Sequence, residues 1–119
     1  MSKKILVVDD DSVMRLGYQL LLKSNHYETF FAADAMAAMS EARKCQPDLI
    51  ILDMGLPAGD GVVVMERLKS NMHLAMVPVI VISSNDANKD RALAAGAKAF
   101  LQKPWKDEEL LATIRQFAV

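Results

Sequence analysis

The sequence lacks the usual marks of a secreted or membrane-bound chain. Its single cysteine, Cys45, cannot form a disulfide within the chain, which fits a reducing compartment. The longest apolar runs, near Leu49–Leu52 and Val77–Ile82, are far too short to span a bilayer. Acidic residues directly follow the opening MSKKILVV, so this segment is not typical of a signal peptide. We therefore expect a cytoplasmic protein with no membrane partner.

An excess of charge of either sign is also missing. The 14 lysines and arginines nearly balance the 15 acidic residues, for a net charge of −1. The basic residues are scattered along the chain, so we expect no direct binding of nucleic acid. With 52% hydrophobic and 24% charged residues, the composition excludes a disordered or fibrous chain. A length of 119 residues predicts one compact domain, which we assign to residues 1–119.

What the chain does contain is a regular alternation of short apolar, β-branched runs with helical patterns. The expected strands are Lys4–Val8, Thr29–Ala32, Leu49–Asp53, Val79–Ser83 and Ala99–Gln102. Five such units predict an α/β fold, a three-layer, doubly wound, five-stranded parallel sheet with helices on both faces. The flavodoxin-like strand order 2-1-3-4-5 needs only five strands. It places a ligand crevice beyond the carboxyl ends of strands 1 and 3.

The helices are predicted from apolar residues that recur every three or four positions and so fall on one helix face. These sets are Val13, Leu16 and Leu20; Met65, Leu68 and Met72; and Leu110, Ile114 and Phe117, with further helices expected at Ala35–Lys44 and Asp86–Ala95. The run Val62–Met65 would also suit a strand, but the preceding Gly61 and the spacing of the methionines favour a helix. Asp11 or Ser12 is expected to cap the first helix.

Polar side chains follow the strands at the edge where the crevice is expected. They are Asp9 and Asp10 after the first strand, Asp53 on the third, Ser83 on the fourth and Lys103 after the fifth. Each residue alone has an ordinary explanation as a turn residue or a solvated charge. Unrelated turn residues have no reason to converge, however, and the expected topology brings these side chains to one crevice.

Three converging carboxylates raise one another's pKa unless a cation neutralises them. Mg²⁺ fits best, because it prefers hard oxygen ligands and is commonly held by one or two carboxylates plus phosphate oxygens. The two histidines, His26 and His73, fall elsewhere and are expected at the surface. A carboxylate can attack phosphorus to form an aspartyl-phosphate, and this chemistry needs a metal, a cation and a hydrogen-bond donor. Mg²⁺, Lys103 and Ser83 would supply them.

Four motifs span almost the whole chain. They are VVDDD at Val7–Asp11, LIILDMGLPAGDG at Leu49–Gly61, VIVISS at Val79–Ser84 and AFLQKPW at Ala99–Trp105. Together they resemble a receiver domain of a two-component response regulator, similar to the chemotaxis regulators. The resemblance implies a bacterial phosphorylation-dependent switch that accepts a phosphoryl group from a sensor histidine kinase or phosphotransfer protein. It implies no enzyme activity beyond the domain's own phosphorylation and dephosphorylation.

The resemblance also implies which residues form the metal and phosphorylation site. Asp53 matches the phosphoacceptor of the family. Asp10 and Asp53 match its direct Mg²⁺ ligands, with the backbone carbonyl of Gly55 as a third. Asp9 matches the acid that holds the metal through a water molecule.

Three further residues match the switch of the family. Ser83 matches the hydroxyl that turns toward the phosphoryl group, and Lys103 matches the cation that contacts it, usually through a cis peptide to the following Pro104. Phe100 matches the aromatic residue that moves inward on activation. The face formed by helix 4, strand 5 and helix 5 would then report the state to an unknown output domain or partner protein.

Two positions depart from common patterns of the family. The segment GAKAF at Gly96–Phe100 stands where the branch with a winged-helix output often carries GADDY, whose acids pair across a dimer interface. We therefore expect a monomer or a weak phosphorylation-dependent dimer. Trp105 stands where phenylalanine is more usual.

A phosphatase of the haloacid-dehalogenase type is an alternative. That superfamily also forms an aspartyl-phosphate with Mg²⁺, and Asp9-x-Asp11 after an apolar strand would make Asp9 the nucleophile. It requires a further pair of acids on another strand after the lysine. Beyond Lys103 the chain offers only Asp107–Glu109, at the start of a helix, and it has no room for a cap domain.

Two binding modules are also alternatives. A flavin or nucleotide module on the same fold would cradle phosphate with glycine-rich backbone at a helix N-terminus, where this chain has the repelling acids Asp9–Asp11. An unphosphorylated receiver-like interaction module would need none of the site residues. Their complete presence favours the phosphorylated switch.

Overall fold

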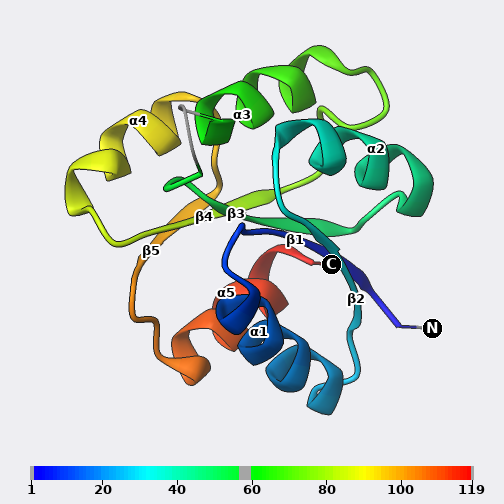
Figure 1. Cartoon of the computed structure of the whole chain (residues 1–119), viewed down its shortest axis with the longest axis vertical. Coiled ribbons are helices and arrows are strands. Elements are labelled where there is room, and N and C mark those ends of the chain that lie inside the picture. Colours follow the sequence, from blue (N-terminus) through cyan, green and yellow to red (C-terminus); the bar gives the residue numbers. More distant parts are fainter. Residues whose placement is uncertain (1, 57–59, 119) are drawn as a thin grey trace.

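A parallel sheet with the order β2-β1-β3-β4-β5 forms the middle layer of the molecule (Figure 1). The computed structural model describes residues 2–56 and 60–118. The strands are β1 (Lys4–Val8), β2 (Glu28–Ala32), β3 (Leu49–Asp53), β4 (Val79–Ser83) and β5 (Ala99–Gln102). The predicted strands and their order are confirmed, with only Glu28 added to the second strand.

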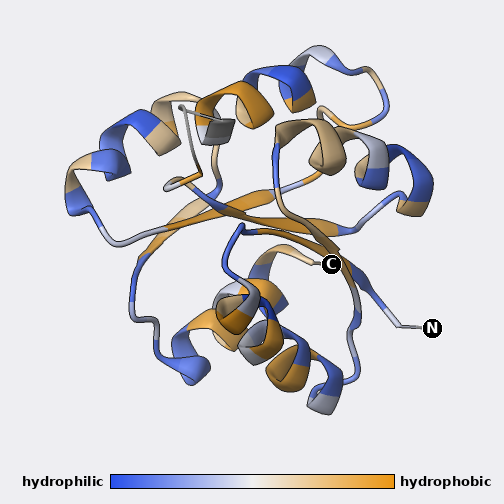
Figure 2. Cartoon of the chain, viewed as in Figure 1, coloured by the Kyte–Doolittle hydropathy of each residue, from blue (hydrophilic) through white to orange (hydrophobic). Residues whose placement is uncertain are grey.

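The three inner strands form the core of the fold. Residues Ile5–Val8 of β1, Leu49–Leu52 of β3 and Val79–Ile82 of β4 are all at most 1% exposed, as expected for strands covered on both faces. The edge strands β2 and β5 are only partly buried. Figure 2 shows the resulting hydrophobic middle layer between more polar helices.

Helices cover both faces of the sheet and complete the predicted three-layer fold. They are α1 (Ser12–Ser24), α2 (Ala35–Cys45), α3 (Asp60–Ser70), α4 (Lys89–Ala94) and α5 (Asp107–Phe117). Figure 1 shows α2, α3 and α4 on one face, and α1 and α5 on the other. A 3-10 turn, η2 (Asp86–Asn88), precedes α4, so the helix expected at Asp86–Ala95 is divided into two parts. In the described part of the chain, no helix is long and apolar enough to cross a membrane.

Aspartate side chains fix the start of the first two helices. The carboxylate of Asp11 accepts hydrogen bonds from the backbone N–H groups of Val13 and Met14, at 2.9 and 3.3 Å. Asp34 caps α2 in the same way, through the N–H of Ala37 at 2.8 Å. These bonds satisfy donors that have no partner within the helix, so each helix begins after only a short loop from the strand that precedes it.

Gly61 allows the helix that contains the β-branched run to lie close to the end of β3. A Cβ atom at this position would lie 3.1 Å from the Cα of Met54 and 3.3 Å from the carbonyl oxygen of Asp53. With any other residue the end of β3 would have to shift by a few tenths of an ångström, so glycine favours this close approach of the first turn of α3. Val64 and Met65 then reach the core and are fully buried, which confirms the helix expected from the sequence.

The apolar set of α1 noted in the sequence does not face the core. Val13, Leu16 and Leu20 are 74, 55 and 65% exposed, whereas Tyr18 and Leu22 are buried. A helical period of 3.6 residues fits either stripe, and the buried one carries the large aromatic side chain. Its ring also stacks on Trp105, a contact that the other stripe does not make. The third helix also ends earlier than its pattern, at Ser70, which leaves Met72 exposed.

Candidate functional site

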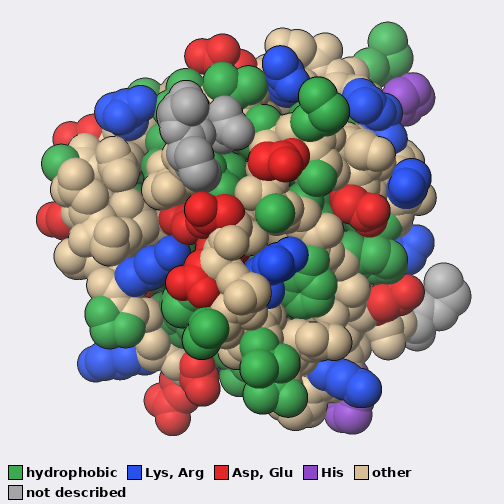
Figure 3. Space-filling view, in the orientation of Figure 1, with side chains coloured by type: hydrophobic (Ala, Val, Ile, Leu, Met, Phe, Trp, Pro, Cys, Tyr) green, Lys and Arg blue, Asp and Glu red, His purple; other side chains and the backbone are tan. Residues whose placement is uncertain are grey.

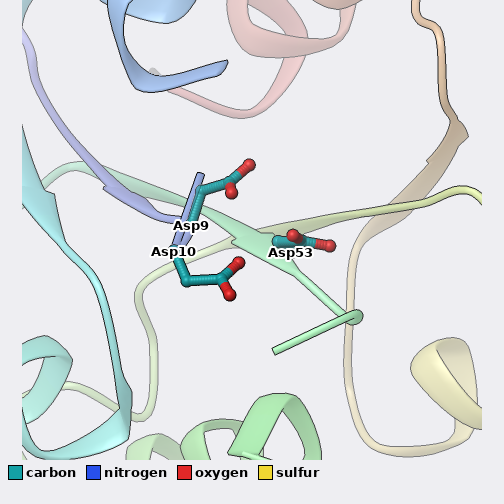
Figure 4. Close-up of side chains that lie close together, drawn as sticks. All are labelled: Asp9, Asp10 and Asp53. Atoms are coloured by element: carbon teal, nitrogen blue, oxygen red, sulfur yellow. The ribbon is translucent and has the colours of Figure 1, made fainter. Parts of the chain in front are cut away.

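The carboxyl ends of β1 and β3 bring three aspartates together, as the sequence predicts. Asp9 follows β1, where its N–H donates to the carbonyl oxygen of Ala32 at 3.0 Å, and Asp53 is the last residue of β3. One carboxylate oxygen from each of Asp9, Asp10 and Asp53 lies within 4.8 Å of the others. Figure 4 shows the three side chains extending from the ends of these strands toward the same side. In Figure 3, acidic side chains gather near the middle of the face shown.

The cluster combines two buried carboxylates with an exposed one. Asp9 is fully buried, Asp53 is 6% exposed and Asp10 is exposed. In the described part of the chain, the Oδ2 atom of Asp9 is buried without a hydrogen-bond partner. Such an atom is costly unless a charge compensates it. This donor set of hard oxygens therefore fits Mg²⁺.

Lys103 is the cation that the structure places against the buried acids. Its Nζ lies 3.1 Å from Oδ2 of Asp53 and 3.6 Å from Oδ2 of Asp9. The other oxygens accept backbone N–H groups, Asp9 Oδ1 from Asp11 and Asp53 Oδ1 from Gly55, both at 2.9 Å. One ammonium group thus faces two carboxylates, which leaves the pair with excess negative charge.

Burial is the main cause that raises the pKa of Asp9 above its ordinary value. The charges of Asp53 and Asp10 also raise this pKa, while the Asp11 N–H and Lys103 lower it. The folded chain therefore binds a proton at Asp9 more tightly than the unfolded chain does. This linkage stabilises the fold at low pH, and the stabilisation is lost as the pH rises through the raised pKa. At neutral pH the cluster is best balanced by a further cation.

The loop after β5 positions Lys103 through backbone and aromatic contacts. The N–H of Lys103 donates to the carbonyl oxygen of Ser83 at 2.8 Å, which extends the pairing of β4 with β5. The peptide bond from Lys103 to Pro104 is cis, as the resemblance implied. Trp105 then stacks on Tyr18 of α1, with ring centroids 4.5 Å apart and an interplanar angle of 11°. The stack ties this loop to α1.

Tyr18 was not identified from the sequence. Burial raises the pKa of its phenol, and the charges of Asp9 and Asp53 raise this pKa further. Its burial and its partner Trp105 depend on which face of α1 packs inward. The only signal in the sequence was that α1 contains a single aromatic residue.

Ser83 lies at the end of β4, beside the strand that carries Asp53, and is 2% exposed. Its Oγ accepts hydrogen bonds from the N–H of Asn85 at 3.0 Å and from Nδ2 of Asn88 at 2.9 Å. It donates to the carbonyl oxygen of Asn85 at 3.3 Å. The hydroxyl is therefore engaged by the segment after β4. Asn88 was also missed in the sequence, because a polar residue in a polar turn gives no signal.

Gly55 lies in the loop after β3 and Phe100 lies on β5, as the predicted topology requires. Gly55 is exposed beside the cluster, and a Cβ atom there would lie 3.2 Å from Oδ1 of Asp53. Phe100 is half-buried on the edge strand β5 and packs against the core under α2, α3 and α4. His26 and His73 are exposed, as expected.

Comparisons with known proteins point to one family. Residues 5–115 match the response regulator receiver domain family. The chain is 38% identical over 117 residues to the response regulator PleD of Caulobacter vibrioides, covering 97% of this chain but 26% of PleD. It is 32% identical to the phosphate regulon regulator PhoB of Escherichia coli, covering 51% of that protein. The chain thus spans about a quarter to a half of these relatives.

Solved structures agree over the whole fold. The chemotaxis response regulator CheY4 of Vibrio cholerae superposes with a TM-score of 0.90 at 28% identity, covering 98% of this chain and 99% of that one. The receiver domain of sensor histidine kinase PA1611 from Pseudomonas aeruginosa gives the same score and identity, covering 99% and 98%. That structure has a magnesium ion coordinated in its active-site cleft.

We predict that Mg²⁺ stabilises the unphosphorylated protein, because it balances the acid cluster. Free Mg²⁺ at ten times its dissociation constant adds about 1.4 kcal/mol by mass action, which raises the thermal midpoint by about 5 °C in a domain of this size. Thermal melts with and without Mg²⁺ measure the effect.

The matched variant for this experiment is Asp10→Asn. It should raise the midpoint of the metal-free protein, since it relieves repulsion, and should lose most of the shift with Mg²⁺. A wild-type midpoint that stays constant up to millimolar Mg²⁺ would argue against a metal at this cluster.

Proposed function

The chain belongs to the response regulator receiver domain family and is a phosphorylation-dependent signalling switch, and from this premise we propose that Asp53 is its phosphoacceptor. The supporting observation is the position of β3 between β1 and β4. Asp53 has the acids Asp9 and Asp10 on one side and the hydroxyl of Ser83 on the other, with Lys103 in contact. A phosphoryl group on Asp53 would meet a metal site, a donor and a cation at once.

Asp9 is less suited to the role of nucleophile that a phosphatase would give it. Asp9 is fully buried. It follows β1, which lies between β3 and the edge strand β2, and β2 ends at Ala32. The residues directly after β2, Ala33 and Asp34, carry no hydroxyl or ammonium group. The geometry thus supports the receiver function over a dehalogenase-type phosphatase.

In the proposed reaction, a carboxylate oxygen of Asp53 attacks the phosphorus of a phosphohistidine on the partner. The new bond joins this oxygen to phosphorus, the phosphorus–nitrogen bond breaks, and the imidazole nitrogen keeps the electron pair and takes up a proton. Lys103 neutralises charge on the transferring oxygens. Mg²⁺ bound by Asp10, Asp53 and the Gly55 carbonyl, and through water by Asp9, would shield the carboxylates from the phosphoryl group.

The new charge then changes the balance between two conformations. Ser83 turns from the segment after β4 to donate to a phosphoryl oxygen. Phe100, half-buried at the sheet edge, moves inward and alters the face of α4, β5 and α5. This face is the surface that we propose for recognition by the output.

The wider context is also part of the proposal. Residues 1–119 act as one receiver domain in the cytoplasm, and a sensor histidine kinase or phosphotransfer protein supplies the phosphoryl group. The output is an attached domain or a separate protein, and the chain is a monomer or a weak phosphorylation-dependent dimer. It is a signalling phosphoacceptor and not an enzyme that acts on another substrate.

We predict that acetyl phosphate with Mg²⁺ adds one phosphoryl group, on Asp53. Asp53→Asn should abolish labelling, since an amide oxygen is a far weaker nucleophile, and Asp9→Asn should reduce the rate but leave the label in place. Intact-mass measurement gives the stoichiometry. Hydroxylamine displaces the phosphate from an acyl phosphate and leaves a hydroxamate, and peptide mass mapping of that hydroxamate gives the position. Label found on Asp9 would instead support the phosphatase, and a stable unlabelled protein would support an unphosphorylated interaction module.

Trp105, the only tryptophan, is expected to report activation. Its indole stacks on Tyr18 and lies two residues beyond Lys103, so a shift of this loop changes its surroundings. Beryllofluoride, a mimic of the phosphoryl group, with Mg²⁺ should change its emission at least about twice as much as Mg²⁺ alone. Asp53→Asn is the control and should respond only to the metal. Equal responses of the wild type to both additions would show that the stack senses no conformational change.

A further inference from the structure

The hydroxyl of Ser83 has no hydrogen-bonding capacity to spare. A serine hydroxyl has one proton and two lone pairs. Here the lone pairs accept from the Asn85 N–H and from Nδ2 of Asn88, and the proton goes to the Asn85 carbonyl oxygen. Donation to a phosphoryl oxygen therefore requires the proton to leave Asn85, and turning the side chain breaks all three bonds.

Asn88 closes this arrangement into a ring of hydrogen bonds. Its backbone N–H donates to the Asn85 carbonyl oxygen at 3.0 Å, while its side chain donates to Ser83 at 2.9 Å. Within residues 2–56 and 60–118, no other side chain bonds to Ser83. Ser83 is buried and Asn88 is half-buried, so this bond is partly shielded from water.

The two asparagines of this segment have separate tasks. The side chain of Asn85 caps η2, since its Oδ1 accepts the N–H of Ala87 at 2.9 Å. Asn88 occupies the cap position of α4, but in the described structure its side chain forms no bond to that helix. It reaches back to Ser83 instead. The residue directly before α4 is thus tied to the residue that must move.

We propose that Asn88 is a positioning residue that holds Ser83 in its unphosphorylated orientation. When Ser83 turns toward the phosphoryl group, the bond from Asn88 breaks, and the freed Asn88 alters the start of α4. The inference rests on the proposed function, because it assigns a regulatory partner to Ser83 within that site. It also states how a hydroxyl beside Asp53 becomes coupled to the helix that carries the proposed output face.

The consequence is an activation equilibrium that Asn88 biases toward the inactive state. A ligand that needs the minor conformation binds with an affinity reduced by the population of that conformation. Loss of one neutral, partly buried hydrogen bond changes such a population by about two- to tenfold. Asn88→Ala should therefore tighten binding of beryllofluoride with Mg²⁺ by about this factor.

The test is a double-mutant cycle with Ser83, read from beryllofluoride affinity at constant Mg²⁺. Asn88→Ala should tighten binding in the wild-type background and have no effect in the Ser83→Ala background, where the hydroxyl is missing. Ala87→Ser changes an exposed side chain of the same turn and should leave the affinity unchanged. Unchanged or weaker binding by Asn88→Ala, or the same factor in both backgrounds, overturns the proposal.

A second measurement separates this proposal from the proposed function. In the free protein without Mg²⁺, the Asn85 amide donates to Ser83, and the Ala87 amide donates to the Asn85 side chain. Asn88→Ala should accelerate hydrogen exchange of the Asn85 amide at least about twofold and leave that of Ala87 unchanged. Equal acceleration of both, or of neither, shows that Asn88 does not hold Ser83. If the wild type binds no beryllofluoride, the proposed function is wrong. The exchange experiment needs no beryllofluoride, so it still shows whether Asn88 holds Ser83 in place.

Discussion

Two buried carboxylates at the ends of adjacent parallel strands are the constraint on which the rest of the site depends. Asp9 and Asp53 are removed from water by the same topology that makes their strands a core, and one ammonium group faces both. Removing an ion from water costs several kcal/mol unless it is paired. The site therefore favours the binding of positive charge. Lys103 supplies part of this charge, and a bound metal ion would supply the rest.

The buried sheet and the side chains that we propose to move on phosphorylation have different roles. The buried residues of β1, β3 and β4 fix the carboxylates and the Ser83 backbone, and this close packing resists gradual deformation. The side chains that the proposed switch would move are held by a few hydrogen bonds and one aromatic stack. Ser83 is tied to Asn85 and Asn88, and the Lys103 loop is tied through Trp105 to α1. A small number of weak contacts can thus be exchanged without disturbing the core.

Much of the fold and the acid cluster could be predicted because they depend on periodicity and topology. Apolar runs such as Leu49–Leu52 identify buried strands, and strand order alone brings Asp9 near Asp53. The buried face of α1 could not be predicted, since two apolar stripes fit one helical period and only packing against β1 and α5 selects Tyr18. The tie between Asn88 and Ser83 depends on the path of a short polar turn, which no periodic pattern records.

Magnesium titration of Lys103→Met by calorimetry tests this electrostatic account most directly. The Lys103 ammonium group donates a hydrogen bond to Oδ2 of Asp53 and lies 3.6 Å from Oδ2 of Asp9, so a metal ion must compete with it for the same negative charge. Removing the ammonium group should tighten Mg²⁺ binding by about fivefold or more, which corresponds to about 1 kcal/mol, the Coulomb energy of a charge pair in high dielectric. Lys106→Met removes an exposed charge from the same loop and should have little effect. Unchanged or weaker Mg²⁺ binding by Lys103→Met would contradict the account.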